Sequence, residues 1–299
     1  MTLRLFLLPL CLLPVFPALS QSLLRSERLP TPANVEHTYL NINAPAGEIF
    51  IKPSISCGSG YWRVSGPDTS VSRQIRVYAA PQGGHLMRTL TLNFAAPQSQ
   101  ARSSANMRVS EQFFAGSTAS RIEVNPDPSA VHDLFLDLGV GACRMDLSGL
   151  SLENVNINSA FSDVVLTYNS ANQIEMKEME IHAANATVIL KHPEYARAGL
   201  VTVQNDMGET RLILGGARIA HSNFYLKSGV GPCFIVIHPN QPVKLILRGG
   251  FFSTIEVAEE FQQVEPGVFV NAAALRSPDK VSKIICDVDF GNISVMSSD

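Results

Sequence analysis

Charge is scarce in this 299-residue chain: only 16% of its residues are charged, and aromatic residues contribute only 7%. So little charge argues against a coiled coil, while a hydrophobic content of 45% is too high for a disordered tail. Neither sign of charge dominates, because 23 basic residues against 26 acidic ones leave a net charge of −3. This balance argues against electrostatic capture of nucleic acid or of an anionic lipid surface.

The sequence also lacks the short motifs that carry common catalytic chemistry. It contains no GxSxG, HExxH, Walker or GxGxxG motif, no CxxC pair, and no two histidines at metal-ligand spacing. The segment Ser277-Pro-Asp-Lys280 matches SxxK, but the KTG and SDN motifs that accompany it in penicillin-recognising enzymes are absent. We therefore predict no catalytic residue, no cofactor-binding residue, no cofactor and no metal ligand.

Long apolar runs are missing except at the N-terminus. There Arg4 precedes the apolar stretch 5–19, and Ala18-Leu19-Ser20 offers a small-x-small cleavage site before Gln21. This pattern predicts a secretory signal peptide over residues 1–20 and export to the periplasm or cell surface, with no membrane span after cleavage. A retained anchor is the alternative, but three prolines within the stretch disfavour a spanning helix.

Four cysteines lie outside the predicted signal: Cys57, Cys143, Cys233 and Cys286. Export would permit disulfides, and four cysteines allow three complete pairings. Buried, unpaired thiols are an equally good interpretation of these residues. The sequence leaves their disulfide state open.

A repeat of about 22 residues occupies the C-terminal half. Six windows share apolar residues at positions one and three and small residues in the middle: LDLGVGACRMDL from Leu136, VNINSAFSDVVL from Val155, MEIHAANATVIL from Met179, VTVQNDMGETRL from Val201, FYLKSGVGPCFI from Phe224 and LILRGGFFSTIE from Leu245. Such a unit indicates a short strand, a tight turn and a second strand, with apolar side chains on one face. A single unit cannot bury that face, whereas stacked copies can.

We therefore predict an all-β fold built as a β-solenoid, with a meander of hairpins as the alternative. If the copies are successive layers, Cys143 and Cys233 lie four strand spacings apart, about 19 Å. Ile157, Ile181 and Val203 should then occupy neighbouring layers of one core, and His182 should point outward.

The N-terminal part of the sequence shows a different pattern of apolar and polar residues. Residues 40–51 repeat the strand-turn-strand rhythm, whereas residues 57–132 resemble strands of an antiparallel sheet with a long polar loop at 95–116. We divide the chain after the signal into a β region at 21–132 and a solenoid array with a C-terminal cap at 133–299.

The segment Leu134–Leu152, LFLDLGVGACRMDLSGLSL, resembles the toast-rack (putative adhesin) family of exported bacterial proteins, which show an LxLGxGxxxLDLSGLxL line. The resemblance covers roughly 131–260 and, more weakly, 35–54. It implies a layered stack of short strands similar to a single-stranded β-helix. It implies no reaction, ligand or catalytic residue. Cys143 and Arg144 stand where the family often has Gly or Glu.

These observations predict an exported, non-catalytic envelope or surface protein of the scaffold or adhesion type, whose partner is a protein or glycan of the cell envelope. One alternative is a β-helical polysaccharide-processing enzyme using Asp137, Asp146 and Asp163 beside Arg144, because stacked coils could bring two carboxylates within glycosidase distance. Outward acids that keep the stack soluble explain the same residues more simply. A sensor of an envelope stress pathway is the second alternative.

Overall fold

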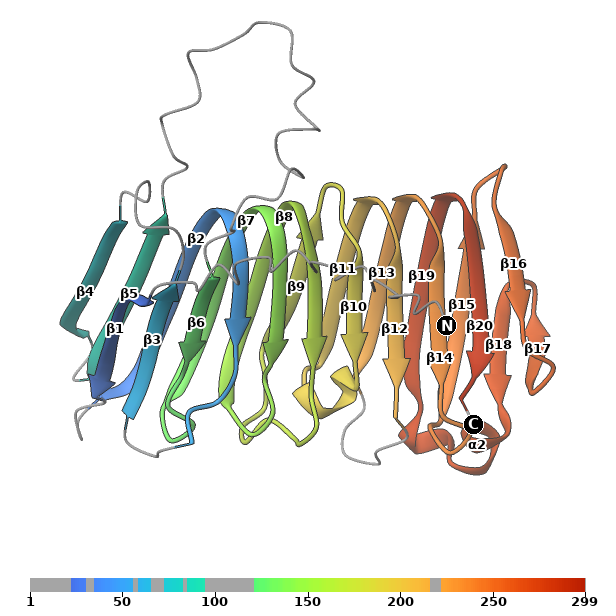
Figure 1. Ribbon diagram of the computed structural model, residues 1–299. Helices are drawn as coiled ribbons and strands as arrows, with labels where there is room; N and C mark the ends of the chain where they lie inside the picture. The colour runs from blue at the N-terminus through green and yellow to red at the C-terminus, as the bar shows by residue number, and fades with distance from the viewer. Residues whose placement is uncertain are drawn as a thin grey trace, which may run out of the picture.

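A computed structural model describes residues 23–30, 35–55, 59–65, 73–82, 85–94, 121–215 and 222–298. The predicted signal peptide, Cys57 and the polar loop at 95–116 lie outside the described residues. The chain forms a row of parallel layers that lie side by side along one axis (Figure 1). Each layer contributes either two strands or the two halves of one long bent strand to two walls, and the two walls enclose a common apolar core.

The central layers follow one another in chain order. They are β7 (Val131–Asp146), β8 (Ser151–Thr167), β9 (Glu178–Ala183) with β10 (Val188–Lys191), β11 (Leu200–Met207) with β12 (Thr210–Leu214), and β13 (Asn223–Val230) with β14 (Cys233–Ile237). Each pairs in parallel with the next. This confirms the all-β prediction. It also decides between the two architectures for these layers, since a meander of hairpins would pair antiparallel.

The layers at the C-terminal end do not follow chain order. The last strands, β19 (Ser282–Phe290) and β20 (Asn292–Ser297), pair in parallel with β13 and β14 on one side. On the other side they pair in parallel with β15 (Val243–Gly249) and β16 (Thr254–Val257). The expectation that the six windows form successive layers is therefore right for the first five and wrong for the sixth.

The N-terminal end shows a similar departure. Strand β2 (Val35–Ile51) lies between β7 and the layer formed by β5 (His85–Phe94) and β6 (Arg121–Asn125), with which it also pairs in parallel. Antiparallel strands follow outside that layer, namely β4 (Arg73–Gln82) on β5, β3 (Ser59–Ser65) on β6 and β1 (Leu23–Pro30) on β3.

Helical structure is confined to short turns among the described residues. They are the 3-10 turns Pro193–Ala196 and Pro278–Lys280 and the helix α2 (Ala272–Arg276), which follows the antiparallel hairpin of β17 (Phe261–Glu265) and β18 (Val268–Asn271). In the described part of the chain, no helix has the length and apolar character needed to cross a bilayer.

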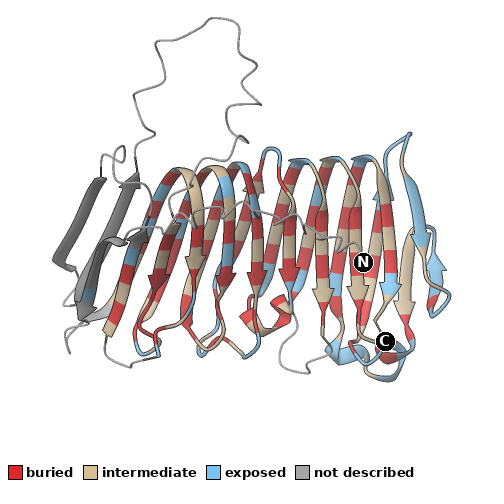
Figure 2. Ribbon diagram, viewed as in Figure 1, coloured by how far each residue is buried: buried red, intermediate tan, exposed pale blue. Residues whose placement is uncertain are grey.

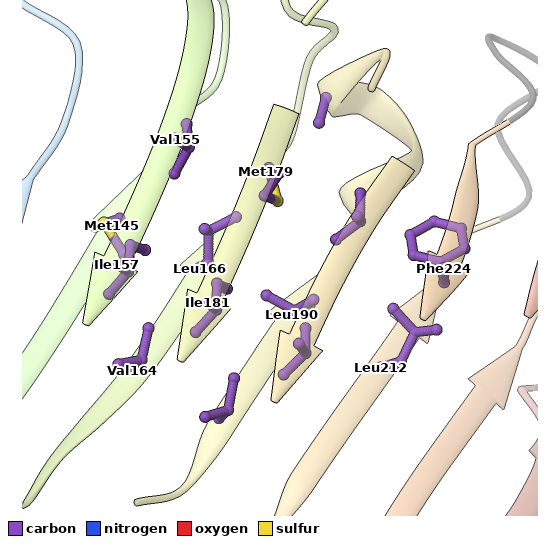
Figure 3. Close-up of a cluster of buried hydrophobic side chains, with 14 of the residues drawn as sticks. Met145, Val155, Ile157, Val164, Leu166, Met179, Ile181, Leu190, Leu212 and Phe224 are labelled. Carbon is purple, nitrogen blue, oxygen red and sulfur yellow. The ribbon is translucent and has the colours of Figure 1, made fainter. Parts of the chain in front are cut away.

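Alternation of apolar and polar residues builds the core. At one register position the inward side chains form a continuous line through the layers and are all at most 3% exposed: Ile42, Leu136, Ile157, Ile181, Val203, Leu226, Cys286 and Leu247. Figure 2 shows the resulting alternation of buried and less buried bands along the strands. Side chains of the two walls, such as Ile157 and Val164, point toward one another (Figure 3). The predicted placement of Ile157, Ile181 and Val203 in neighbouring layers is confirmed.

Glycine shapes the bend between the two walls. Gly231 has a φ of 138°, and a Cβ placed on it would lie 2.1 Å from the carbonyl oxygen of Gly208 in the preceding layer. The same contact recurs between Gly141 and Gly47. Only a residue without a side chain fits this approach, so the small residues in the repeat windows mark the bend.

Candidate functional site

The three carboxylates named from the sequence are not brought together. Asp163 pairs in register with Ala142, four residues before Asp146 on β7, so the two carboxylates lie about 13 Å apart along the strand direction. That separation exceeds the 5–9.5 Å that glycosidase pairs require. Asp137 belongs to the other wall, on the part of β7 that precedes the bend.

Asp146 and Asp163 instead fix turns. One Asp146 carboxylate oxygen accepts hydrogen bonds from the backbone and hydroxyl of Ser148, two residues later. One Asp163 oxygen accepts a hydrogen bond of 2.9 Å from the backbone N–H of Thr187 in the next layer. Arg144 lies with its guanidinium 6.0 Å from the ring centroid of Phe50. These contacts account for all three side chains structurally.

Asp137 belongs to a line of outward polar residues, which we call the polar ladder. It places one polar side chain per layer at a single register position, next to the buried line described above: Asn43, Asp137, Asn158, His182, Gln204, Lys227, Asp287 and Arg248. Successive members are separated by one strand spacing, about 4.8 Å. The outward position of His182 agrees with the sequence-based prediction.

A groove with a volume of about 560 Å³ lies along the first part of the polar ladder. Its polar lining consists of the ladder residues from Asn43 to Gln204 together with Ser159 and Asp206. The rest of the lining is small or apolar: Leu138, Gly139, Ala160, Ala183 and Ala184. These small residues stand at the bend between the walls, where larger side chains would fill the space.

Contacts along the strands and between layers hold the groove side chains in place. The Asn158 amide donates to a carboxylate oxygen of Asp137 at 3.1 Å, and the Gln204 amide donates to Asp206 at the same distance. His182 Nε2 lies 3.2 Å from a carboxylate oxygen of Glu180. The groove therefore presents a row of hydrogen-bonding acceptors and donors, some of which pair with one another.

The groove carries negative and neutral polar groups. Among the described residues that line it, Asp137 and Asp206 are acidic and none is Lys or Arg. Such a lining suits a ligand that offers hydroxyl or amide groups and does not suit an anion.

Two aromatic residues lie beside the groove on the same wall. Phe135 precedes Asp137 by two residues on β7, so both point outward, and Phe135 is 37% exposed. The Tyr39 ring stacks on it, with centroids 6.5 Å apart and planes inclined by 11°. Together they form an apolar shelf next to a polar groove.

A second polar cluster, formed by His37, Asp133 and Glu153, borders that shelf. Nε2 of His37 lies 3.3 Å from Asp133 and 3.4 Å from Glu153. The three ligand-type atoms lie within 4.8 Å of one another, as a small cation would require. Lys177 pairs with Glu153, which is the main reason why the pKa of Lys177 is raised. The Asn154 amide donates to Asp133 at 2.6 Å, so both carboxylates of the cluster already have partners within the protein.

Sequence reasoning did not find this cluster, because its members are 20 or more positions apart. They meet because neighbouring layers bring β2, β7 and β8 together and because an irregularity in register follows His132. Spacing along the chain contains no signal for such a site.

Comparison with known proteins adds little to this description. No family model and no curated protein matches the chain. A crystal structure of a putative cell adhesion protein from Clostridium sporogenes is similar over 92% of this chain and 99% of that one, with 13% identity and a TM-score of 0.43. That degree of likeness is too low to support an argument, so the fold and the groove rest on the strand pairing and contacts above.

Proposed function

We propose that the chain is an exported, non-catalytic adhesion-type module of the bacterial envelope or surface, and that the groove on its polar ladder binds an uncharged glycan. The observation that carries the proposal is the groove lining. It combines acidic and amide side chains with no Lys or Arg among its described residues, and it lies beside the shelf formed by Tyr39 and Phe135.

The chemistry of a sugar fits such a surface. Carboxylate and amide groups accept and donate hydrogen bonds to hydroxyl groups, and the apolar face of a sugar ring packs on an aromatic ring. Asn158 already pairs with Asp137, and Gln204 with Asp206, before any ligand arrives, which reduces the entropy lost on binding. The row of layers extends in one direction, as a binding surface for a linear polymer would.

The enzyme alternative finds less support in the groove. Asp137 and Asp206 are its two carboxylates, and three layer spacings separate their strands, a lateral distance of about 14 Å. This is beyond the range in which two carboxylates share one glycosidic bond. The sensor alternative predicts that a partner protein, rather than a glycan, is recovered on the same surface.

A glycan array tests the proposal directly. We expect residues 21–299 to bind uncharged polysaccharides of the envelope, with no release of reducing ends measured in parallel. Replacing Asp137 and Gln204 by Ala should weaken binding about tenfold or more, because two hydrogen-bonding groups are lost. Gln262→Ala, on the exposed hairpin strand β17, is the matched control and should bind normally.

Three results would count against the proposal. Reducing-end release that disappears in Asp137→Asn would make the protein an enzyme. Equal binding by the double variant and the control would place the ligand elsewhere. Binding only to anionic polymers would contradict the charge argument.

Export is tested separately. In a bacterial host, the full-length chain should appear outside the cytoplasm with Gln21 as its first residue, as read by N-terminal sequencing. Retention in the cytoplasm with Met1 intact would contradict export without bearing on the glycan groove.

A further inference from the structure

Two buried cysteines face each other inside the C-terminal part of the stack. Cys233 is the first residue of β14, Cys286 lies within β19, and both are 0% exposed. Their sulfur atoms are 3.3 Å apart. The pair connects opposite walls of two adjacent layers, because β19 pairs with β13 and β14 pairs with β20.

We infer that Cys233 and Cys286 form a disulfide that fixes the last coil of the chain between two earlier ones. A disulfide has a sulfur–sulfur length of about 2.05 Å, so the two atoms need to approach by little more than 1 Å. The bond would join residues 53 positions apart in sequence. It therefore ties the coil that departs from chain order to the layer on which that coil docks.

The layer geometry excludes Cys143 as a partner for either residue. Cys143 reaches Cys233 through Val164, Val188 and Thr210, which makes four layer spacings, about 19 Å. Cys286 lies one layer further along. Two α-carbons must lie within about 7 Å for a disulfide, so the described residues leave one compatible pair.

The bond forms by exchange with an external disulfide, supplied by oxidised glutathione or by a disulfide oxidoreductase. The thiolate of one cysteine attacks that disulfide, and the first thiolate of the oxidant leaves. The second cysteine then attacks the mixed disulfide, which closes the protein bond and releases the second thiol of the oxidant. Two protein thiols are thereby oxidised and one disulfide of the oxidant is reduced to two thiols.

Burial determines when this exchange can occur. The hydrogen bond to Cys233 and burial both raise the pKa of the Cys286 thiol, so few thiolates are available once the stack is closed. The exchange therefore takes place while the last coil is still docking. Afterwards the closed layers shield the bond from reductants. In the cell this requires the oxidising compartment of the proposed export route, whereas a refolding experiment does not.

The test is oxidative refolding of residues 21–299 in a glutathione redox buffer, followed by acid quenching, alkylation under denaturing conditions and peptide mapping. We expect a Cys233–Cys286 peptide, with Cys57 and Cys143 alkylated. Reduction should lower the melting temperature by about 5 °C or more. Cys143→Ala is the matched control and should keep both the bridge and the shift. The double variant Cys233→Ala with Cys286→Ala should show no shift on reduction.

Complete alkylation of all four cysteines, or a bridge that joins Cys233 or Cys286 to Cys57 or Cys143, would overturn the inference. If the chain does not refold in vitro, the peptide mapping is carried out instead on protein secreted into the periplasm of an expression host. The same two outcomes then decide. Glycan binding is measured independently, so failure of the bridge and failure of the proposed function are distinguishable.

Discussion

The middle of the stack and its two ends are assembled in different ways. Between β7 and β13, layers that are consecutive in sequence pair with each other. At each end, the second parallel layer from the outside comes from a part of the chain near a terminus. At one end β2 pairs with β7, and at the other end β19 pairs with β13. Partners such as His37 with Val131 or Phe224 with Ile284 are therefore far apart in sequence.

This difference has consequences for stability and for folding. Central layers can form by local propagation, because neighbouring coils are joined by short connections. The terminal coils dock only after a long loop has closed, which costs entropy before any contact is gained. Once docked, β2 and β19 each have a parallel partner on both edges.

The largest expected effect comes from removing the inserted coil, which is formed by β19 and β20 and lies between β13–β14 and β15–β16. A chain that ends at residue 281 lacks β19 and β20, so β15 and β16 lose their parallel partners, whereas β13 and β14 keep β11 and β12 on their other edge. The inward residues of the missing layer are also absent from the core. We expect hydrogen exchange to show loss of protection throughout β15–β18, while β7–β9 stay protected. Truncation after residue 298 is the control. Unchanged protection of β15 would show that it docks directly on β13.

A buried charge in the middle of the stack should have the next largest effect. Ile181 is 0% exposed, so Ile181→Asp places an unpaired carboxylate in the core and should cost roughly 3–5 kcal/mol in the free energy of unfolding. His182→Asp, at the neighbouring outward position, should cost less than about 1 kcal/mol. Urea denaturation measures both. Equal losses of unfolding free energy in the two variants would contradict the assignment of Ile181 as inward and His182 as outward.

Adding a side chain at the bend between the two walls should have the third largest effect on stability. Gly231→Ala should destabilise by about 2 kcal/mol or more, because its Cβ meets the Gly208 carbonyl oxygen and φ is positive. A Cβ on Gly199 would have nothing within 4 Å, so Gly199→Ala should change the stability by less than about 0.5 kcal/mol. Similar melting temperatures for the two variants would contradict the close approach of the layers.

The smallest expected effect is a pH dependence that comes from His132, at the start of β7. His132 is buried where β7 begins, and its Nε2 lies 2.6 Å from the carbonyl oxygen of Asp127. Burial lowers the pKa of His132 in the folded state, although nearby Asp127 and Asp133 oppose this. The unfolded chain therefore binds a proton more readily, and the contribution of His132 is present above pH 6.5 and lost as the pH falls toward the folded-state pKa.

Urea denaturation at pH 7.5 and pH 5 measures this contribution. We expect the free energy of unfolding to fall on acidification, and to fall less in His132→Gln, which cannot titrate. His37 is a second histidine beside Asp133, with Nε2 3.3 Å from its carboxylate, so His37→Gln serves as the comparison. An identical pH dependence in His132→Gln and the unaltered protein would show that His132 makes no such contribution.

Alternation in the sequence was sufficient to predict the walls and the core of the central layers. It also predicted the four-layer separation of Cys143 and Cys233, which the register confirms. It placed the first window wrongly by two residues, because Leu134 and not Leu136 pairs with Val155. A period of two leaves any even shift equally compatible with an apolar face, so the pattern alone cannot fix the register.

The inserted coil was not predictable for a related reason. Leu226 pairs with Cys286, and Leu247 pairs with Cys286 on the other side. The sequence pattern alone would equally allow Leu226 to pair directly with Leu247, since all three positions are inward and apolar. The groove was only partly predictable: Asp137 was named as a candidate, but its partners in the polar ladder become neighbours only when the layers are in register.

The placement of the last coil also determines how the protein responds to mechanical load. A pull on the C-terminus acts on β20, which is held by β14 on one edge and β16 on the other. The backbone hydrogen bonds on both edges then resist sliding together, whereas a coil at the outer end of the stack could be peeled away one bond at a time. Tension applied at β20 is therefore transmitted into the interior of the stack rather than to its outermost strand.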